Sequence, residues 1–180
     1  DLGFSSSVYG FGAGLFFVGY ALFEVPSNLV LYRVGARKWI ARIMITWGLL
    51  SAGTIFVEGP LSFYALRFAL GVAEAGFFPG IAYYLQQWFP GKHRGEALGL
   101  FMMAIPLSNL IGGPSAGLLL GLDGVLGLPG WHWMFLGQGL PASILGFVVL
   151  WYLTDSPAEA RWLPDELGPV CPCQLDAVER

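Results

Sequence analysis

Five apolar stretches, each close to the length that crosses a lipid bilayer, constrain what this chain can fold into. They lie at about residues 5–31, 39–57, 61–88, 96–120 and 131–153. A helix needs about 20 mainly apolar residues to span the hydrocarbon core, and it satisfies its backbone hydrogen bonds internally. The pattern therefore predicts an all-α fold, a polytopic transmembrane helical bundle with five spans over residues 1–153. A polar segment follows at 154–180.

Composition agrees with a membrane protein and argues against several other classes. Hydrophobic residues make up 56% of the chain and charged residues only 12%, whereas a soluble domain carries about 25% charged residues. The sequence contains no basic tract of the kind that binds nucleic acid, so we expect no nucleic acid as a partner. Cys171 and Cys173 lack nearby Cys or His ligands to complete a zinc site, so we expect no metal and no cofactor. The chain starts at Asp1 without a methionine or a leader sequence, which predicts a piece of a longer protein.

Basic residues alternate between the turns, and this alternation predicts the orientation of the chain. The turns after the first and third stretches are basic, Arg161 follows the fifth stretch, and the two intervening turns carry no Lys or Arg. The basic residues of the first two of these turns include Arg33, Arg37, Lys38, Lys92 and Arg94. Because basic loops stay on the cytoplasmic side, we expect residues 154–180 to form a cytoplasmic linker segment.

The third stretch carries one arginine and one glutamate inside an otherwise apolar run. Arg67 and Glu74 are seven residues apart, so on a helix they lie on nearly the same face, about 10.5 Å apart along the axis. A charged side chain at bilayer depth costs at least about 2.5–3.5 kcal/mol to insert. Such residues usually face a protein interior or a watery cavity and mark a functional site. Arg67 and Glu74 are therefore the leading site candidates.

A series of sequence motifs runs along about residues 1–167. The first three are Gly19–Asn28, the basic turn Arg33–Ile40 and the segment Arg67–Gly80. The later ones are Trp88–Pro90, His93–Ala97, Gly130–Phe135, Asp155–Pro157 and Ala160–Leu163. In their order and intervals these motifs resemble the anion:cation symporter family, a group of organic-anion transporters within the major facilitator superfamily.

This resemblance implies a fold of twelve helices in two halves, in which the five stretches correspond to helices two to six of the first half. The superfamily's motif between helices two and three is usually Gly-x-x-x-Asp-Arg-x-Gly followed by basic residues. The residues that match this cytoplasmic loop motif are Arg33, Gly35, Arg37 and Lys38. Asn28 occupies the glycine position and Tyr32 the aspartate position. The resemblance thus implies the loop's fold, but not the charge-relay role of that aspartate.

The resemblance also implies a cavity arginine at Arg67 and a protonatable glutamate at Glu74. A planar guanidinium suits a carboxylate, and a low-dielectric cavity favours the neutral form of a carboxyl group. We therefore expect Glu74 to take up a proton, while Arg67 anchors an anion or pairs with an acid on helix one of the family fold. The alternative is a structural ion pair that only holds helices together. Tyr20 and Asn109 are further substrate-binding candidates, and Glu24 is a second proton-coupling candidate. Ordinary helix packing remains the alternative for Tyr20 and Asn109, and a gate residue that packs near the cytoplasmic end is the alternative for Glu24.

The function that the resemblance implies is secondary active transport of a small organic anion by alternating access, coupled to protons or to another cation such as sodium. No phosphate-binding loop is present, so an ion gradient would supply the energy. We expect the lipid bilayer as a further partner, and the bacterial inner membrane as the location. The family's substrates include sugar acids, dicarboxylates, aromatic acids and vitamins, and the sequence does not choose among them.

Two other interpretations remain. A truncated fragment that does not transport, and acts at most as a helical membrane module, is compatible with the same motifs. A membrane-embedded enzyme would need a nucleophile with its base or a cluster of metal ligands. The spans contain no His-x-x-x-His pattern and no paired acids, so we expect that the protein is not an enzyme.

Overall fold

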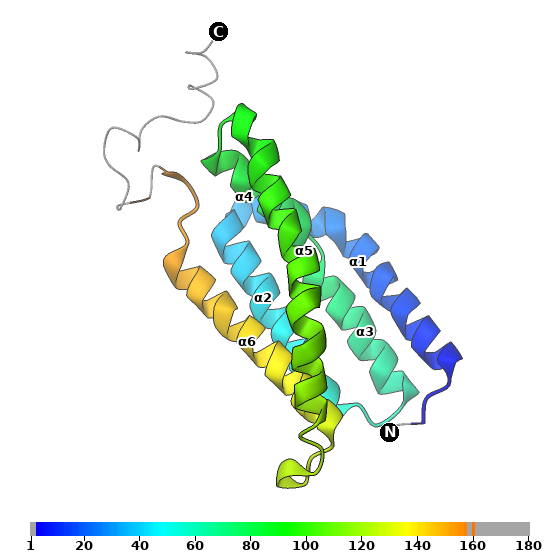
Figure 1. The fold of residues 1–180 in the computed structure, drawn as a ribbon. Helices are drawn as coiled ribbons and strands as arrows, with labels where there is room; N and C mark the ends of the chain where they lie inside the picture. The colour runs from blue at the N-terminus through cyan, green and yellow to red at the C-terminus, as the bar shows by residue number, and fades with distance from the viewer. Residues whose placement is uncertain (1–2, 158–159, 161–180) are drawn as a thin grey trace.

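The computed structural model describes residues 3–157 and residue 160. Within them the chain forms α-helices and two short 3-10 helices that run up and down one bundle (Figure 1). In chain order these are α1 (Ser6–Val34), α2 (Ala36–Ala52), η1 (Gly53–Phe56), α3 (Pro60–Glu74), α4 (Phe77–Trp88), α5 (Gly91–Leu120), η2 (Val125–Gly127) and α6 (Gly130–Tyr152). They make five stretches that are long and apolar enough to cross a membrane. The predicted all-α bundle with five spans is confirmed.

The helix bounds show where the spans begin and end. The second span includes η1, and the third consists of α3 and α4 together. Most of the expected linker at 154–180, including Arg161, Cys171 and Cys173, lies outside the described residues. The α1–α2 and α4–α5 junctions, which carry the basic residues, lie at the same end of the bundle (Figure 1). The predicted orientation places both basic turns on the cytoplasmic side, and it therefore requires these two junctions to lie at one end of the bundle.

A single residue, Gly35, joins α1 to α2. This junction is shorter than the loop expected between the first stretch, which was placed to end at residue 31, and the second, which was placed to begin at residue 39. Gly35 has a φ angle of 94°, which glycine adopts without strain. Arg33 therefore lies in the last turn of α1, and Arg37 in the first turn of α2. The Arg37 backbone N–H donates to Asp155 Oδ1 at 2.7 Å, and Arg37 Nε lies 3.9 Å from Asp155 Oδ2. A carboxylate that follows α6 thus holds the start of α2.

Glycine pairs set how closely the helices approach. A Cβ on Gly71 of α3 would overlap the Phe16 carbonyl of α1, and one on Gly19 would lie 2.7 Å from the Phe68 carbonyl. On the other side of the bundle, a Cβ on Gly139 of α6 would lie 2.7 Å from the Gly48 carbonyl of α2. Small residues of this kind let backbones of membrane helices pack directly against each other. The α1–α3 and α2–α6 pairs are accordingly the most extensively packed.

We expect Gly71→Ala to destabilise the protein by about 1–3 kcal/mol, because the added methyl group overpacks the α1–α3 contact. Gly14→Ala is the matched control. A Cβ there meets no atom of the described chain within 4 Å, and alanine favours a helix over glycine by about 1 kcal/mol. Thermal unfolding in detergent should give a lower melting temperature for Gly71→Ala and no loss for Gly14→Ala. Equal melting temperatures would contradict the packing that the structure shows.

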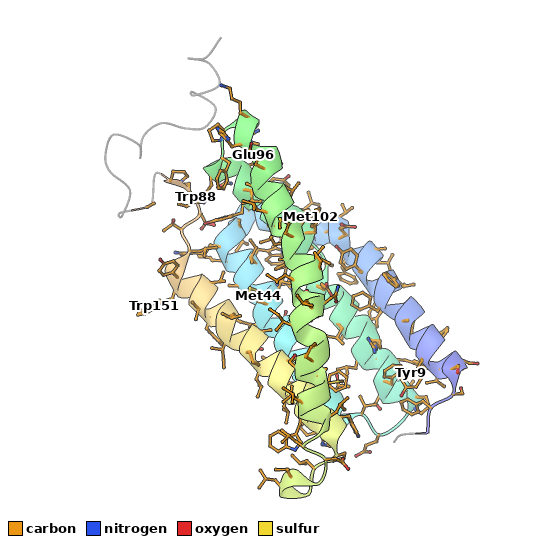
Figure 2. All side chains as sticks on the ribbon, in the orientation of Figure 1. Tyr9, Met44, Trp88, Glu96, Met102 and Trp151 are labelled. Carbon is orange, nitrogen blue, oxygen red and sulfur yellow. The ribbon has the colours of Figure 1, made fainter. Side chains whose placement is uncertain are left out.

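The outer surface of the bundle is strongly apolar. None of the residues of α5 is buried, and this helix packs only against α4 and α6 to any extent. In Figure 1, α5 crosses in front of the other helices. Trp151, which is 95% exposed, points away from α6 into the surroundings (Figure 2). Exposed aromatic and aliphatic side chains of this extent fit a lipid environment or contact with further helices.

Candidate functional site

One stripe of α3 carries both membrane-depth charges. Phe63, Arg67, Leu70 and Glu74 follow one another at intervals of four, three and four residues, so they share a single helix face. Phe63 and Leu70 are buried, and the two charged residues are half-buried. The apolar members hold the stripe against neighbouring helices, and this packing turns Arg67 and Glu74 toward the interior of the bundle.

Arg67 and Glu74 line the same cavity, which we call the central hollow. Its volume is about 260 Å³. The remaining polar lining consists of Ser51 of α2 and Thr54 of η1. The apolar lining comes from four segments and includes Phe16, Trp47, Leu70 and Phe135. The hollow therefore combines a cation, a carboxyl group and two hydroxyl groups within apolar walls, which is the usual make-up of a small-molecule site.

Two further hollows adjoin the central one along α3. One of about 290 Å³ lies toward the start of α3 and shares Thr54, Arg67 and Phe135 with the central hollow. The other, of about 180 Å³, lies toward the end of α3 and shares Trp47 and Glu74. The three hollows thus follow one another, with Arg67 at the first boundary and Glu74 at the second.

The Arg67 guanidinium has unused hydrogen-bonding capacity. Its Cζ atom lies 5.1 Å from the centroid of the Phe63 ring, a cation–π contact. No Asp or Glu in the described part of the chain comes within the 4.0 Å of an ion pair with it, although Glu74 lines the same hollow. A guanidinium offers five N–H donors in a planar fork. Arg67 can therefore receive a carboxylate in the central hollow.

Glu74 is the last residue of α3. The next two residues leave the helical conformation: Ala75 has a ψ angle of 126° and Gly76 a φ angle of 86°. The third expected span, 61–88, is therefore interrupted directly after the glutamate. Interrupted membrane helices place backbone polar groups beside ligands and coupling ions in transporters. The span expected at 61–88 contained no such break.

The other predicted site residues lie further from the central hollow. Tyr20 and Glu24 are half-buried and lie one helical turn apart on α1. Asn109 is exposed on α5. None of the three lines the hollows along α3. The structure thus brings Arg67 and Glu74 to one cavity and leaves Asn109 apart from it.

Sequence reasoning missed the wall that faces Arg67. Trp47, Ser51 and Thr54 follow one another at intervals of four and three residues, which places them on one face of the second span. Two hydroxyl groups on the face of an otherwise apolar span are a usable signal for a polar cavity. Within residues 3–157 and 160, no three His, Cys, Asp or Glu side chains form a group that could hold a metal ion.

Fold and site together define a class: a multi-pass membrane helix bundle with a charged, partly polar cavity between its spans. Residues 1–173 match the profile of the Major Facilitator Superfamily. The chain belongs to this family, which is one of membrane transporters. This match confirms the predicted membership of the major facilitator superfamily. Because the family consists of transporters, it also confirms the expectation that the chain is not an enzyme.

Curated relatives are similar over most of this chain. It is 62% identical over 166 residues to a "Putative tartrate transporter" of Agrobacterium vitis, an alignment that covers 92% of this chain and 38% of the relative. It is 52% identical over 166 residues to the "Quinolone resistance transporter" of Acinetobacter baumannii, with coverage of 92% and 38%. It is 44% identical over 180 residues to the "Inner membrane transport protein RhmT" of Escherichia coli, with coverage of 100% and 42%. The chain thus spans about two fifths of the length of these relatives.

A solved structure supports the fold. A bacterial homolog of the human lysosomal transporter Spinster, in an inward-facing and occupied conformation, aligns with a TM-score of 0.61 at 20% sequence identity. The alignment covers 81% of this chain and 35% of that protein. At this identity the likeness concerns the arrangement of the helices alone. It agrees with the assignment of the five spans to a major facilitator fold.

Proposed function

We propose that the protein carrying this chain is a secondary transporter of small organic acids in the bacterial inner membrane. The observation that supports this proposal most directly is the central hollow, where the unpaired Arg67 and the carboxyl of Glu74 meet two hydroxyl groups. A bidentate guanidinium–carboxylate contact gives both affinity and orientation. The hydroxyl groups of Ser51 and Thr54 suit a substrate that itself carries hydroxyl groups, such as a hydroxylated dicarboxylate.

The substrate class rests on the site and on the relatives together. The hollow offers one cation, one carboxyl group and two hydroxyl groups, and this polar lining suits a small polar acid. One similar protein is described as a "Putative tartrate transporter" and another as an "Inner membrane transport protein". We therefore propose tartrate and related dicarboxylates as the first substrates to test.

Coupling to a cation is part of the same proposal. Glu74 lies at the boundary between two hollows, beside apolar residues that disfavour an isolated charge. When the carboxyl group takes up a proton, its charge disappears, and the electrostatic balance with Arg67 and a bound anion changes. Proton binding and anion binding at one cavity are then linked. Tyr20 and Glu24, one helical turn apart on α1, are proposed as secondary contributors.

The test uses the full-length gene product that contains these residues, reconstituted in proteoliposomes. Vesicles loaded with unlabelled tartrate should take up labelled tartrate by exchange, and other dicarboxylates should compete for this uptake. An imposed pH gradient and an imposed sodium gradient, applied separately, identify the coupling ion. Exchange of a quinolone in place of every organic acid would contradict the proposed substrate class, and absence of any exchange would contradict the transport function.

A further inference from the structure

The break after Glu74 leaves backbone carbonyl groups that no helical hydrogen bond satisfies. A helix end leaves its last carbonyl groups without intrahelical partners, and such groups are costly inside a membrane. Ala75 is 0% exposed, so water does not replace the missing donor. A side chain from another helix is needed.

Ser27 of α1 supplies this donor. Its hydroxyl group donates to the Ala75 carbonyl at 2.5 Å and accepts a hydrogen bond from Trp39 Nε1 of α2 at 2.9 Å. Ser27 is only 7% exposed. A short chain of hydrogen bonds, from Trp39 through Ser27 to Ala75, therefore joins α1, α2 and the break in the third span.

The backbone at the break fits closely against the same serine. A Cβ on Gly76 would overlap Ser27 Oγ, and one on Gly80 of α4 would lie 2.8 Å from the Leu31 side chain. With a φ angle of 86°, Gly76 also has a backbone conformation that favours glycine. The break is therefore fixed against α1 by a hydrogen bond on one side and by close packing on the other.

We propose that Ser27, supported by Trp39, is a positioning residue for Glu74. The carboxyl group belongs to the last helical residue before Ala75, so its place in the central hollow depends on where the helix ends. Loss of the Ser27 hydroxyl group leaves the Ala75 carbonyl unpaired, and α3 then frays toward Glu74. This inference rests on the proposed function only where it treats Glu74 as a coupling group. The positioning itself follows from the contacts of Ser27 with Ala75, Trp39 and Gly76.

Chemical labelling of Glu74 tests the positioning independently of transport. Dicyclohexylcarbodiimide is an apolar reagent that reacts with protonated carboxyl groups, and mass spectrometry measures its attachment to Glu74 in the full-length protein. We expect Ser27→Ala to lower the labelling rate at neutral pH at least about fivefold, the factor associated with one lost buried hydrogen bond. A frayed break admits water, which favours the unreactive, ionised form. Ser27→Thr keeps the hydroxyl group but adds a methyl group beside Gly76, so its rate should lie between those of Ser27→Ala and the wild type.

Two more variants make the result interpretable. Trp39→Phe removes the Nε1 donor and keeps an aromatic ring, so we expect a smaller decrease in the same direction. This variant also carries the test where Ser27→Ala fails to fold. Ser143→Ala is the matched control, since Ser143 is a buried serine of α6 whose hydroxyl group donates to the Ile45 carbonyl at 3.2 Å, away from the break. Its labelling rate should stay within about twofold of the wild type.

The outcomes separate a positioning role from a general structural one. Equal labelling in Ser27→Ala and Ser143→Ala would overturn the proposal, as would a wild-type Glu74 that does not react. In the transport assay, Ser27→Ala should lose gradient-driven uptake at least about fivefold while exchange is retained. A parallel loss of uptake and exchange would also overturn it. If the wild type exchanges no organic acid, the proposed function fails, and the labelling still decides whether Ser27 positions Glu74.

Discussion

Glu74→Gln should abolish uptake driven by a pH gradient while exchange of substrate across the membrane continues. Glutamine keeps the size and polarity of the side chain but cannot take up the coupling proton. Net uptake that depends on proton binding therefore falls to the level measured without a gradient. Exchange needs only substrate binding and alternation between the two faces, so it should remain within a few-fold of the wild type.

Proteoliposome uptake with and without an imposed pH gradient, together with exchange at equal pH, measures both activities. Glu58→Gln is the matched control, because Glu58 is an exposed carboxylate in the turn before α3, outside the hollows. It should keep both activities. Undiminished pH-driven uptake by Glu74→Gln would refute the coupling role of Glu74.

Arg67→Ala should reduce substrate affinity by about two orders of magnitude or more. The loss combines the charge with the two parallel hydrogen bonds of a guanidinium–carboxylate contact, each worth about 1.5–3 kcal/mol, and 1.4 kcal/mol corresponds to a factor of ten. Arg67→Lys retains the charge and loses the planar fork, so its affinity should fall about tenfold. The graded order of wild type, lysine and alanine distinguishes recognition of a carboxylate from simple attraction by a positive charge.

The concentration dependence of exchange gives these affinities. Arg94→Lys is the control, since Arg94 lies in the first turn of α5, near the α4–α5 junction, and its Nε donates to the Phe89 carbonyl at 3.0 Å. It should leave the affinity unchanged. If Arg67→Ala binds substrate as tightly as the wild type, Arg67 is a structural residue, and the central hollow is not the substrate site.

The cytoplasmic loop motif shows how tertiary structure supplies a group that the local sequence lacks. The family motif usually has an aspartate at the position of Tyr32, and this chain has none there. In the structure, the Tyr32 ring packs against Tyr83 at 4.8 Å between centroids, and Asp155 places a carboxylate beside Arg37. Tyr83 and Asp155 both lie on later segments of the chain, the second 118 positions after Arg37, so the loop sequence alone could not have shown these contacts.

The sequence by itself determined the membrane class, the five spans and the shared face of Arg67 and Glu74. These features depend on hydropathy and on the fixed period of a helix, which are local properties of the chain. Only the tertiary structure decided which side chains face that pair. It placed Ser51 and Thr54 opposite Arg67, left Asn109 exposed, and ended α3 directly after Glu74. The reason is that glycine contacts between distant helices and one serine hydroxyl group select the packing, and the partner of a residue on another helix is not a local property of the sequence.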